Sequence, residues 1–158
     1  MKRSINILFI SAILTISSLY SQNNESKDDV NAIKHVIEKE VDALNRDHDL
    51  EAYLSCFAQS EKVQVGPSND KMTIGYKAIK ANAENVIKNY NGKPNPNTWS
   101  FADWDIRVNG NTAFASCLQT TKTAQNTYID VFKSDYLEKI NGEWKIVDHR
   151  YFHAPERK

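Results

Sequence analysis

The chain has 158 residues, of which 41% are hydrophobic and 25% are charged, and its 20 Lys and Arg residues balance its 20 Asp and Glu residues. This length suits one domain with a hydrophobic core of its own. The formal net charge of zero does not favour nucleic acid or an anionic membrane as a partner, since proteins that bind these usually carry a net positive charge.

The N-terminus has the pattern of a secretory signal peptide over residues 1–21. Lys2 and Arg3 precede an apolar run that ends at Tyr20, and the polar string SQNNESKDD follows. Cleavage after residue 21 would leave 22–158 as one exported domain, periplasmic or secreted. The alternative is a retained membrane anchor, but the run is shorter than the roughly 20 apolar residues that a spanning helix needs.

Two helices are predicted next. Apolar residues recur at helical spacing after Ser26, which should open the first helix, as far as Leu44. Asp47 or Asp49 can cap a second, short helix, because an aspartate side chain accepts hydrogen bonds from the free amide groups at a helix start. The second helix should bury one apolar face, made of Leu50, Tyr53, Leu54 and Phe57.

The pattern then changes to strands. KVQVG and MTIG have the character of two short strands, and a third helix is predicted between Gly75 and the turn-forming string NGKPNPN. After this string, apolar residues recur with a period of two, as in strands that bury one face. Asn109-Gly110 and Asn141-Gly142 are typical hairpin turns. The chain should therefore end in a four-stranded antiparallel meander.

This order of elements predicts an α+β fold. We expect a cone-shaped, curled antiparallel sheet with three helices from the N-terminal half of the chain packed on its concave face. Such a sheet leaves a conical cavity between strands and helices, and cavities are the usual binding sites for small molecules. A ligand is therefore expected inside the cone.

The two cysteines, Cys56 and Cys117, stand in the apolar contexts YLSCFA and AFASCLQ. An exported protein meets an oxidising compartment, so a disulfide is one alternative. Two buried free thiols are the favoured interpretation, because sequence alone does not show that the geometry permits a bond. No zinc-type spacing occurs, and neither a metal nor a cofactor is expected.

Three separated segments, AIKHVIEKEVDALNRDHDLEAYLSCFA, IGYKAIKANAENVI and YLEKINGEWKIVDHRYF, together resemble the nuclear transport factor 2-like superfamily. The most similar branch contains the SnoaL-like proteins and the calcium/calmodulin-dependent kinase association domains. The resemblance implies a conical fold and dimers formed through the sheet. It leaves the activity open, since the superfamily contains isomerases, dehydratases and association hubs. Val65 stands where the ketosteroid isomerases of this superfamily have a general-base aspartate, so the isomerase reaction is disfavoured.

The last strand, EWKIVDHRYFH, carries the main candidate site residues. Strict alternation places Asp148 and Arg150 on the same face as Trp144. The other face then carries His149 and His153. Because Trp144 is a natural core residue, Asp148 and Arg150 are expected to face the concave side near the cavity mouth. There they would either bind a polar ligand or form a structural ion pair, since buried charges need partners.

Three aromatic residues should point at the same interior. Tyr53, Phe57 and Trp104 would either be ordinary core residues or form the apolar wall of the ligand pocket, with the Tyr53 hydroxyl as a donor. Asp130 is a further candidate, as a polar residue among apolar neighbours. No metal site is expected, because the two histidines of the last strand lie about 13 Å apart along it.

The favoured function is an exported small-molecule-binding protein with its ligand in the conical cavity, and no catalytic residue is assigned. One alternative is a lyase- or isomerase-like enzyme that uses a pocket carboxylate, and another is a homo-oligomeric association module. The long strands carry apolar residues on both faces, while helices should cover only one of them. A homodimer formed through the sheet is therefore expected.

Overall fold

The computed structural model describes the backbone of residues 8–67 and 70–153 and, within these ranges, the side chains from residue 27 onward. The signal peptide predicted for residues 1–21 lies outside the described side chains. In the part of the chain that the structure describes, no helix combines the length and apolar character needed to cross a membrane. Export therefore stays a prediction.

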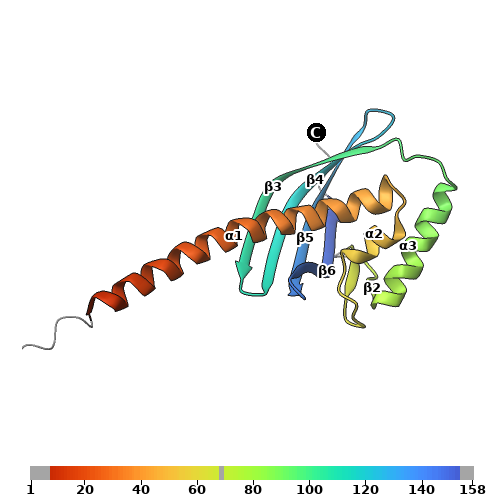
Figure 1. The fold of residues 1–158 in the computed structure, drawn as a ribbon. Coiled ribbons are helices and arrows are strands. Elements are labelled where there is room, and N and C mark those ends of the chain that lie inside the picture. Colours follow the sequence, from red (N-terminus) through yellow and green to blue (C-terminus); the bar gives the residue numbers. More distant parts are fainter. Residues whose placement is uncertain (1–7, 68–69, 154–158) are drawn as a thin grey trace, which may run out of the picture.

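The fold is α+β, as predicted, with three helices against one curled, open sheet (Figure 1). Its strands follow the order β2-β1-β6-β5-β4-β3, and the β1–β6 pair alone among neighbouring strands is parallel. The elements in chain order are α1 (Leu8–Asn45), α2 (Leu50–Ser55), β1 (Gln64–Pro67), β2 (Thr73–Ile74), α3 (Tyr76–Tyr90), β3 (Thr98–Asn109), β4 (Thr112–Lys122), β5 (Tyr128–Ile140) and β6 (Glu143–His153).

Local signals explain most of the element boundaries. The side chain of Asp49 accepts a hydrogen bond of 2.9 Å from the amide of Ala52 and so caps α2, as predicted. Asn141 and Gly142 both have positive φ, which is the conformation of a tight hairpin turn. The predicted helix start at Ser26 is wrong, because α1 already contains this residue and no Gly or Pro interrupts the segment before it.

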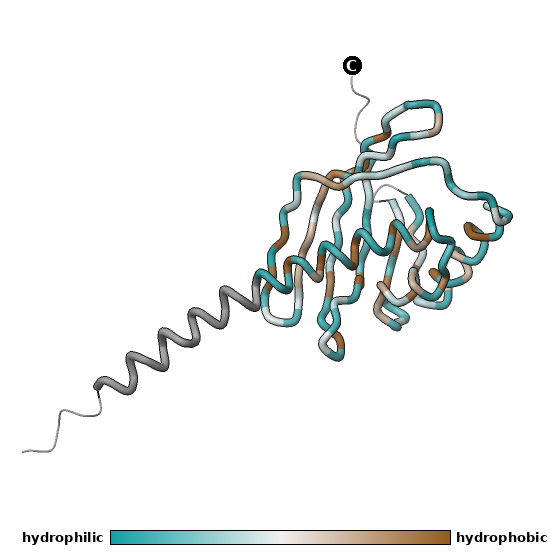
Figure 2. Tube along the Cα trace, turned by 45° about the horizontal axis from the view of Figure 1, so that its top comes forward, coloured by the Kyte–Doolittle hydropathy of each residue, from teal (hydrophilic) through white to brown (hydrophobic). Residues whose placement is uncertain are grey.

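The core lies between α1 and the concave face of the sheet. Ile33 and Ile37 of α1 are fully buried, as are Leu137 of β5 and Ile146 of β6. Figure 2 shows hydrophobic and hydrophilic positions alternating along the strands and along the part of α1 that crosses them. This alternation gives the sheet one face that packs against helices and one face that does not.

A β-bulge in β6 decides which of its side chains face the core. Leu137 pairs with Ile146, whereas the preceding Tyr136 pairs with Asp148, so Val147 is an extra residue without a partner on β5. The main-chain amide and carbonyl of Ile146 also bond to Cys56 and Ala58, at 2.8 and 2.9 Å. The bulge reverses the alternation for the rest of the strand.

The outer face of the sheet exposes aromatic side chains. No described helix covers this face (Figure 1), and neighbouring strands bring the aromatic residues together in cross-strand pairs. We call this surface the outer aromatic patch. It consists of Phe114, Phe132, Tyr136 and Phe152, which are 40–49% exposed.

Both cysteines are buried free thiols, as the favoured interpretation predicted. Burial raises the pKa of Cys56 to about 11 and that of Cys117 to about 12. Because the thiolate is the reactive form of cysteine, both side chains are poor nucleophiles at neutral pH.

Candidate functional site

Four charged or titratable side chains gather on the concave face of the sheet, and each is at most 8% exposed. We call them the buried cluster: Glu40 of α1, Lys133 and Asp135 of β5, and His149 of β6. Lys133 and Asp135 lie four and two positions before the core residue Leu137 on β5, so all three side chains lie on the same face of the sheet. The bulge at Val147 turns His149 toward the same side. Such burial of charge is expensive unless the groups pair.

The cluster consists of two hydrogen-bonded pairs. Nδ1 of His149 lies 2.7 Å from Oδ1 of Asp135, and Nζ of Lys133 donates to Oε2 of Glu40 at 2.9 Å. The second carboxylate oxygen of Asp135 is buried and has no hydrogen-bond partner among the described residues. Nε2 of His149 likewise makes no hydrogen bond within the described part of the chain. The pair thus leaves one carboxylate oxygen and one ring nitrogen without a hydrogen bond among the described residues.

Mutual attraction keeps the Lys133–Glu40 pair ionised. Burial alone would raise the pKa of Glu40, but the charge of Lys133 and the hydrogen bond from Lys133 lower it below its usual value. Burial acts in the opposite sense on Lys133, and the charges of Glu40 and Asp135 outweigh it and raise the pKa of the ammonium group. The interior thus holds the Lys133 ammonium group together with the Glu40 carboxylate that balances its charge.

Three of the predicted site residues lie in this interior. Tyr53 is buried and packs against Phe57 with 5.0 Å between ring centroids, and Trp104 is partly buried against the core. Burial, followed by the negative charge of Glu40, raises the pKa of the Tyr53 hydroxyl. This hydroxyl therefore keeps its proton at neutral pH and can act as a hydrogen-bond donor.

Asp148 and Arg150 do not face the interior, so their predicted placement is wrong. They pair across β5 with Tyr136 and Ser134, on the outer side of the sheet. The carboxylate of Asp148 accepts from Nε of Arg150 at 3.0 Å and from Gln64 at 2.9 Å. The physical reason is the bulge, which shifts every later residue of β6 by one position and gives the inward place to His149.

Asp130 also lies on the outer side. Its Oδ1 atom accepts a hydrogen bond of 2.7 Å from the hydroxyl of Thr120, its neighbour on β4. Both residues lie on the same face of the sheet as the exposed Phe132. Asp130 is thus placed away from the buried cluster.

The turn between α1 and α2 holds another histidine. The ring of His48 stacks on Tyr90 at a centroid distance of 4.2 Å, and its Nε2 atom is buried without a hydrogen-bond partner. Asp49 is occupied by its helix cap. The described residues contain no group of three or more potential ligands able to hold a metal ion.

The sequence analysis missed all four members of the buried cluster as a site. Two signals in the sequence could have indicated it. Glu40 continues the apolar helix face of Ile33 and Ile37. Lys133 and Asp135 share the strand face of Leu137. A separate hollow of about 620 Å³ lies near the β5–β6 turn, and no member of the buried cluster lines it.

A model of the SnoaL-like domain family matches residues 33–151. A search of curated proteins found no match.

Solved structures show the same fold at low sequence identity. A protein of unknown function with a cystatin-like fold from Nostoc punctiforme is 17% identical, with a TM-score of 0.66, covering 80% of this chain and 92% of its own. A proposed dehydratase of the nuclear transport factor 2-like family from Streptomyces avermitilis is 13% identical, with a TM-score of 0.66 and coverages of 82% and 99%. A proposed scytalone dehydratase from Novosphingobium aromaticivorans is 14% identical, with a TM-score of 0.65 and coverages of 84% and 89%.

Proposed function

The chain belongs to the SnoaL-like domain family of the nuclear transport factor 2-like superfamily, and from this membership we propose that it is an exported protein that binds a small polar molecule at the buried cluster and acts on it as a lyase. The observation that carries the proposal is the hydrogen bond between His149 and the fully buried Asp135. Export rests on the N-terminal sequence pattern alone.

The His149–Asp135 pair has the geometry of a general base. A carboxylate at Nδ1 holds the imidazole in the tautomer that carries its proton on Nδ1, which leaves the lone pair of Nε2 free to accept a proton. Asp135 also favours the imidazolium that forms when the proton is taken up. Its unpartnered Oδ2 atom can accept a hydrogen bond from a ligand hydroxyl.

The neighbouring charges suit an elimination next to a carbonyl group. Nε2 of His149 would take the proton from the carbon beside the carbonyl, and the released electron pair would form a carbon–carbon double bond as a β-hydroxyl leaves. The imidazolium would return the proton to that hydroxyl, so that water is the second product. Lys133 supplies positive charge near the developing enolate, and the protonated Tyr53 supplies a donor. The proposed dehydratases among the structural neighbours favour this reaction class.

A thermal-shift screen of β-hydroxy carbonyl compounds tests the proposal, because a ligand that binds the native state raises its melting temperature. Compounds that stabilise the protein are then incubated with it, and the loss of water is followed by NMR. We expect His149→Gln to reduce turnover by about 100-fold or more, since general-base catalysis contributes about 10²–10⁴-fold. The matched control is His35→Gln, which changes an exposed histidine of α1 and should leave turnover unchanged.

The same experiment separates catalysis from binding alone. Suppose that a ligand stabilises the wild-type protein, does not stabilise Asp135→Asn, and is not converted to product. This result would assign the cluster to binding and refute the lyase. The absence of stabilisation by every compound of this class would refute the substrate class as well.

A second function is favoured by the outer aromatic patch. Four aromatic side chains that are 40–49% exposed form two cross-strand pairs on the uncovered face, and exposed apolar surfaces of this kind usually mark interfaces. We propose that a second copy of the chain covers this patch, so that the protein is a homodimer. Light scattering at micromolar concentration should give twice the mass of one chain. Phe132→Lys should yield a monomer, whereas Ile74→Lys, at an exposed position on β2, should remain a dimer.

A further inference from the structure

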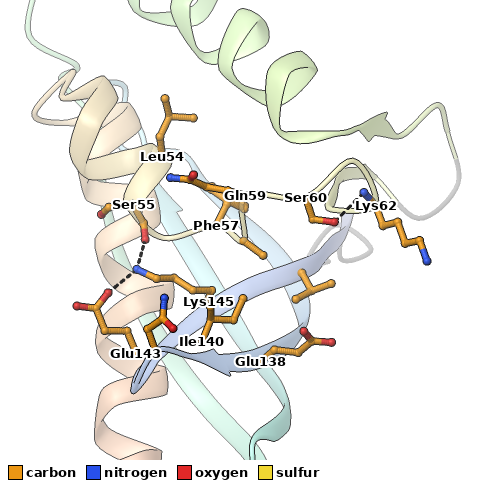
Figure 3. Close-up of a pocket in the computed structure, with 13 residues that line it drawn as sticks. Leu54, Ser55, Phe57, Gln59, Ser60, Lys62, Glu138, Ile140, Glu143 and Lys145 are labelled. Atoms are coloured by element: carbon orange, nitrogen blue, oxygen red, sulfur yellow. Dashed lines mark hydrogen bonds and ion pairs between the residues drawn. The ribbon is translucent and has the colours of Figure 1, made fainter.

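A hollow of about 620 Å³ lies between the end of α2 and the β5–β6 hairpin, separate from the buried cluster (Figure 3). Apolar side chains from both sides line it, including Leu54 and Phe57 near α2 and Ile140 and Val147 on the strands. Its volume lies in the range of sites that bind small molecules, roughly 300–1,000 Å³. An apolar body of moderate size therefore fits it.

Lys145 brings a positive charge into this hollow. Its Nζ atom donates to the main-chain oxygen of Ser55 and to Oε2 of Glu143, both at 2.7 Å (Figure 3). Lys39 reaches the same serine from α1 and donates to its hydroxyl at 2.9 Å. Both ammonium groups thus bond to Ser55, and Lys145, which lines the hollow, attracts a negative charge there.

The carboxylate that now pairs with Lys145 is weakly held. The side chain of Glu143 is 73% exposed, whereas that of Lys145 is 20% exposed. Exposed ion pairs contribute little free energy, because water solvates the carboxylate nearly as well as the partner does. Lys145 is less well solvated and gains more from a counter-ion. Another carboxylate can therefore replace Glu143 at small cost.

We propose that the hollow is a binding site for a monocarboxylate with an apolar body. The ligand carboxylate takes the place of the Glu143 side chain on Lys145, and the apolar body lies against Ile140 and Val147. Glu138, the cross-strand neighbour of Lys145, also borders the hollow and disfavours a second negative charge on the ligand. Glu143 thus acts as a built-in competitor for the ligand.

Titration of the full chain with octanoate and with uncharged octanamide, followed by NMR, tests this site. Octanoate should bind at least about tenfold more tightly than octanamide, and Lys145→Gln should remove this difference, since a hydrogen bond to a charged group is worth about 1.5–3 kcal/mol. Glutamine keeps a donor for the Ser55 carbonyl and so preserves the local fold. Glu143→Gln removes the competitor and should tighten octanoate binding by up to about fivefold.

Two control variants locate the binding. Lys80→Gln, on the exposed surface of α3, and His149→Gln, in the buried cluster, should both bind octanoate as the wild-type protein does. Equal affinities for octanoate and octanamide would overturn the proposal, as would an unchanged affinity in Lys145→Gln. Weaker octanoate binding in Glu143→Gln would overturn it too, because it would make this side chain a ligand contact rather than a competitor.

Discussion

Replacing Lys133 with methionine should strongly destabilise the fold. The side chains of Lys133 and Glu40 are 4% and 8% exposed, and the pair is joined at 2.9 Å. Methionine fills a similar volume but leaves the Glu40 carboxylate buried without its cation. Breaking a buried ion pair in this way costs about 3–5 kcal/mol, which is a large part of the roughly 5–15 kcal/mol by which whole domains are stable.

Urea denaturation at pH 7, followed by tryptophan fluorescence, measures this loss. Lys80→Met provides the matched control, because Lys80 forms an exposed pair with Glu84 at 3.8 Å on α3. The control should lose no more than about 0.5 kcal/mol. The double variant Lys133→Met/Glu40→Gln should recover much of the loss, since it removes the unpaired charge. A single variant that loses less than about 1 kcal/mol would refute the reasoning, as would a double variant no more stable than the single one.

Three further predictions concern acid stability, the outer ion pair and a helix cap. The folded protein holds the pKa of Glu40 below its ordinary value of 4.5, so this carboxylate stabilises the fold above that pH, and the stabilisation is lost as the pH falls through the folded pKa. Urea unfolding at pH 7, 5 and 3 should therefore show a steeper loss of stability for the wild-type protein than for Lys133→Met/Glu40→Gln. Asp148→Asn should cost less than about 1 kcal/mol and leave any ligand-induced thermal shift intact, because the Asp148–Arg150 pair is partly exposed on the outer face; loss of the shift would return this residue to the site. Asp49→Ala should cost about 1 kcal/mol through the lost cap of α2, whereas Asp47→Ala should cost less, and equal losses would contradict the capping role.

Signals within a few residues of each other predicted the elements correctly. Asn141 and Gly142 form the predicted turn with both residues at positive φ, whereas the first hairpin turns at Gly110 and Asn111, one residue after the start of the Asn109-Gly110 dipeptide. The period-two pattern likewise identified the strands of the meander, and the resemblance to the nuclear transport factor 2-like superfamily is confirmed by the family match and the fold.

The site could not be predicted in the same way, because it depends on contacts between distant parts of the chain. Glu40 and Lys133 are 93 positions apart, and neither sequence context identifies the other as its partner. The bulge is held by bonds from Ile146 to the segment after α2, which no pattern within β6 reveals. Strict alternation therefore placed Asp148 and Arg150 in the interior and His149 outside, the reverse of the structure.

The extra residue in β6 also decides which reactive side chains of this strand face the interior. Straightening the bulge, so that Val147 paired with Tyr136, would turn His149 to solvent and direct Asp148 and Arg150 toward the helices, whereas deleting Val147 would leave these three side chains on their present sides. A one-residue shift in the pairing of β6 with β5 would thus exchange a histidine-based interior for one that carries an acid and a guanidinium. Two chains with the same letters along the last strand can therefore enclose different reactive groups.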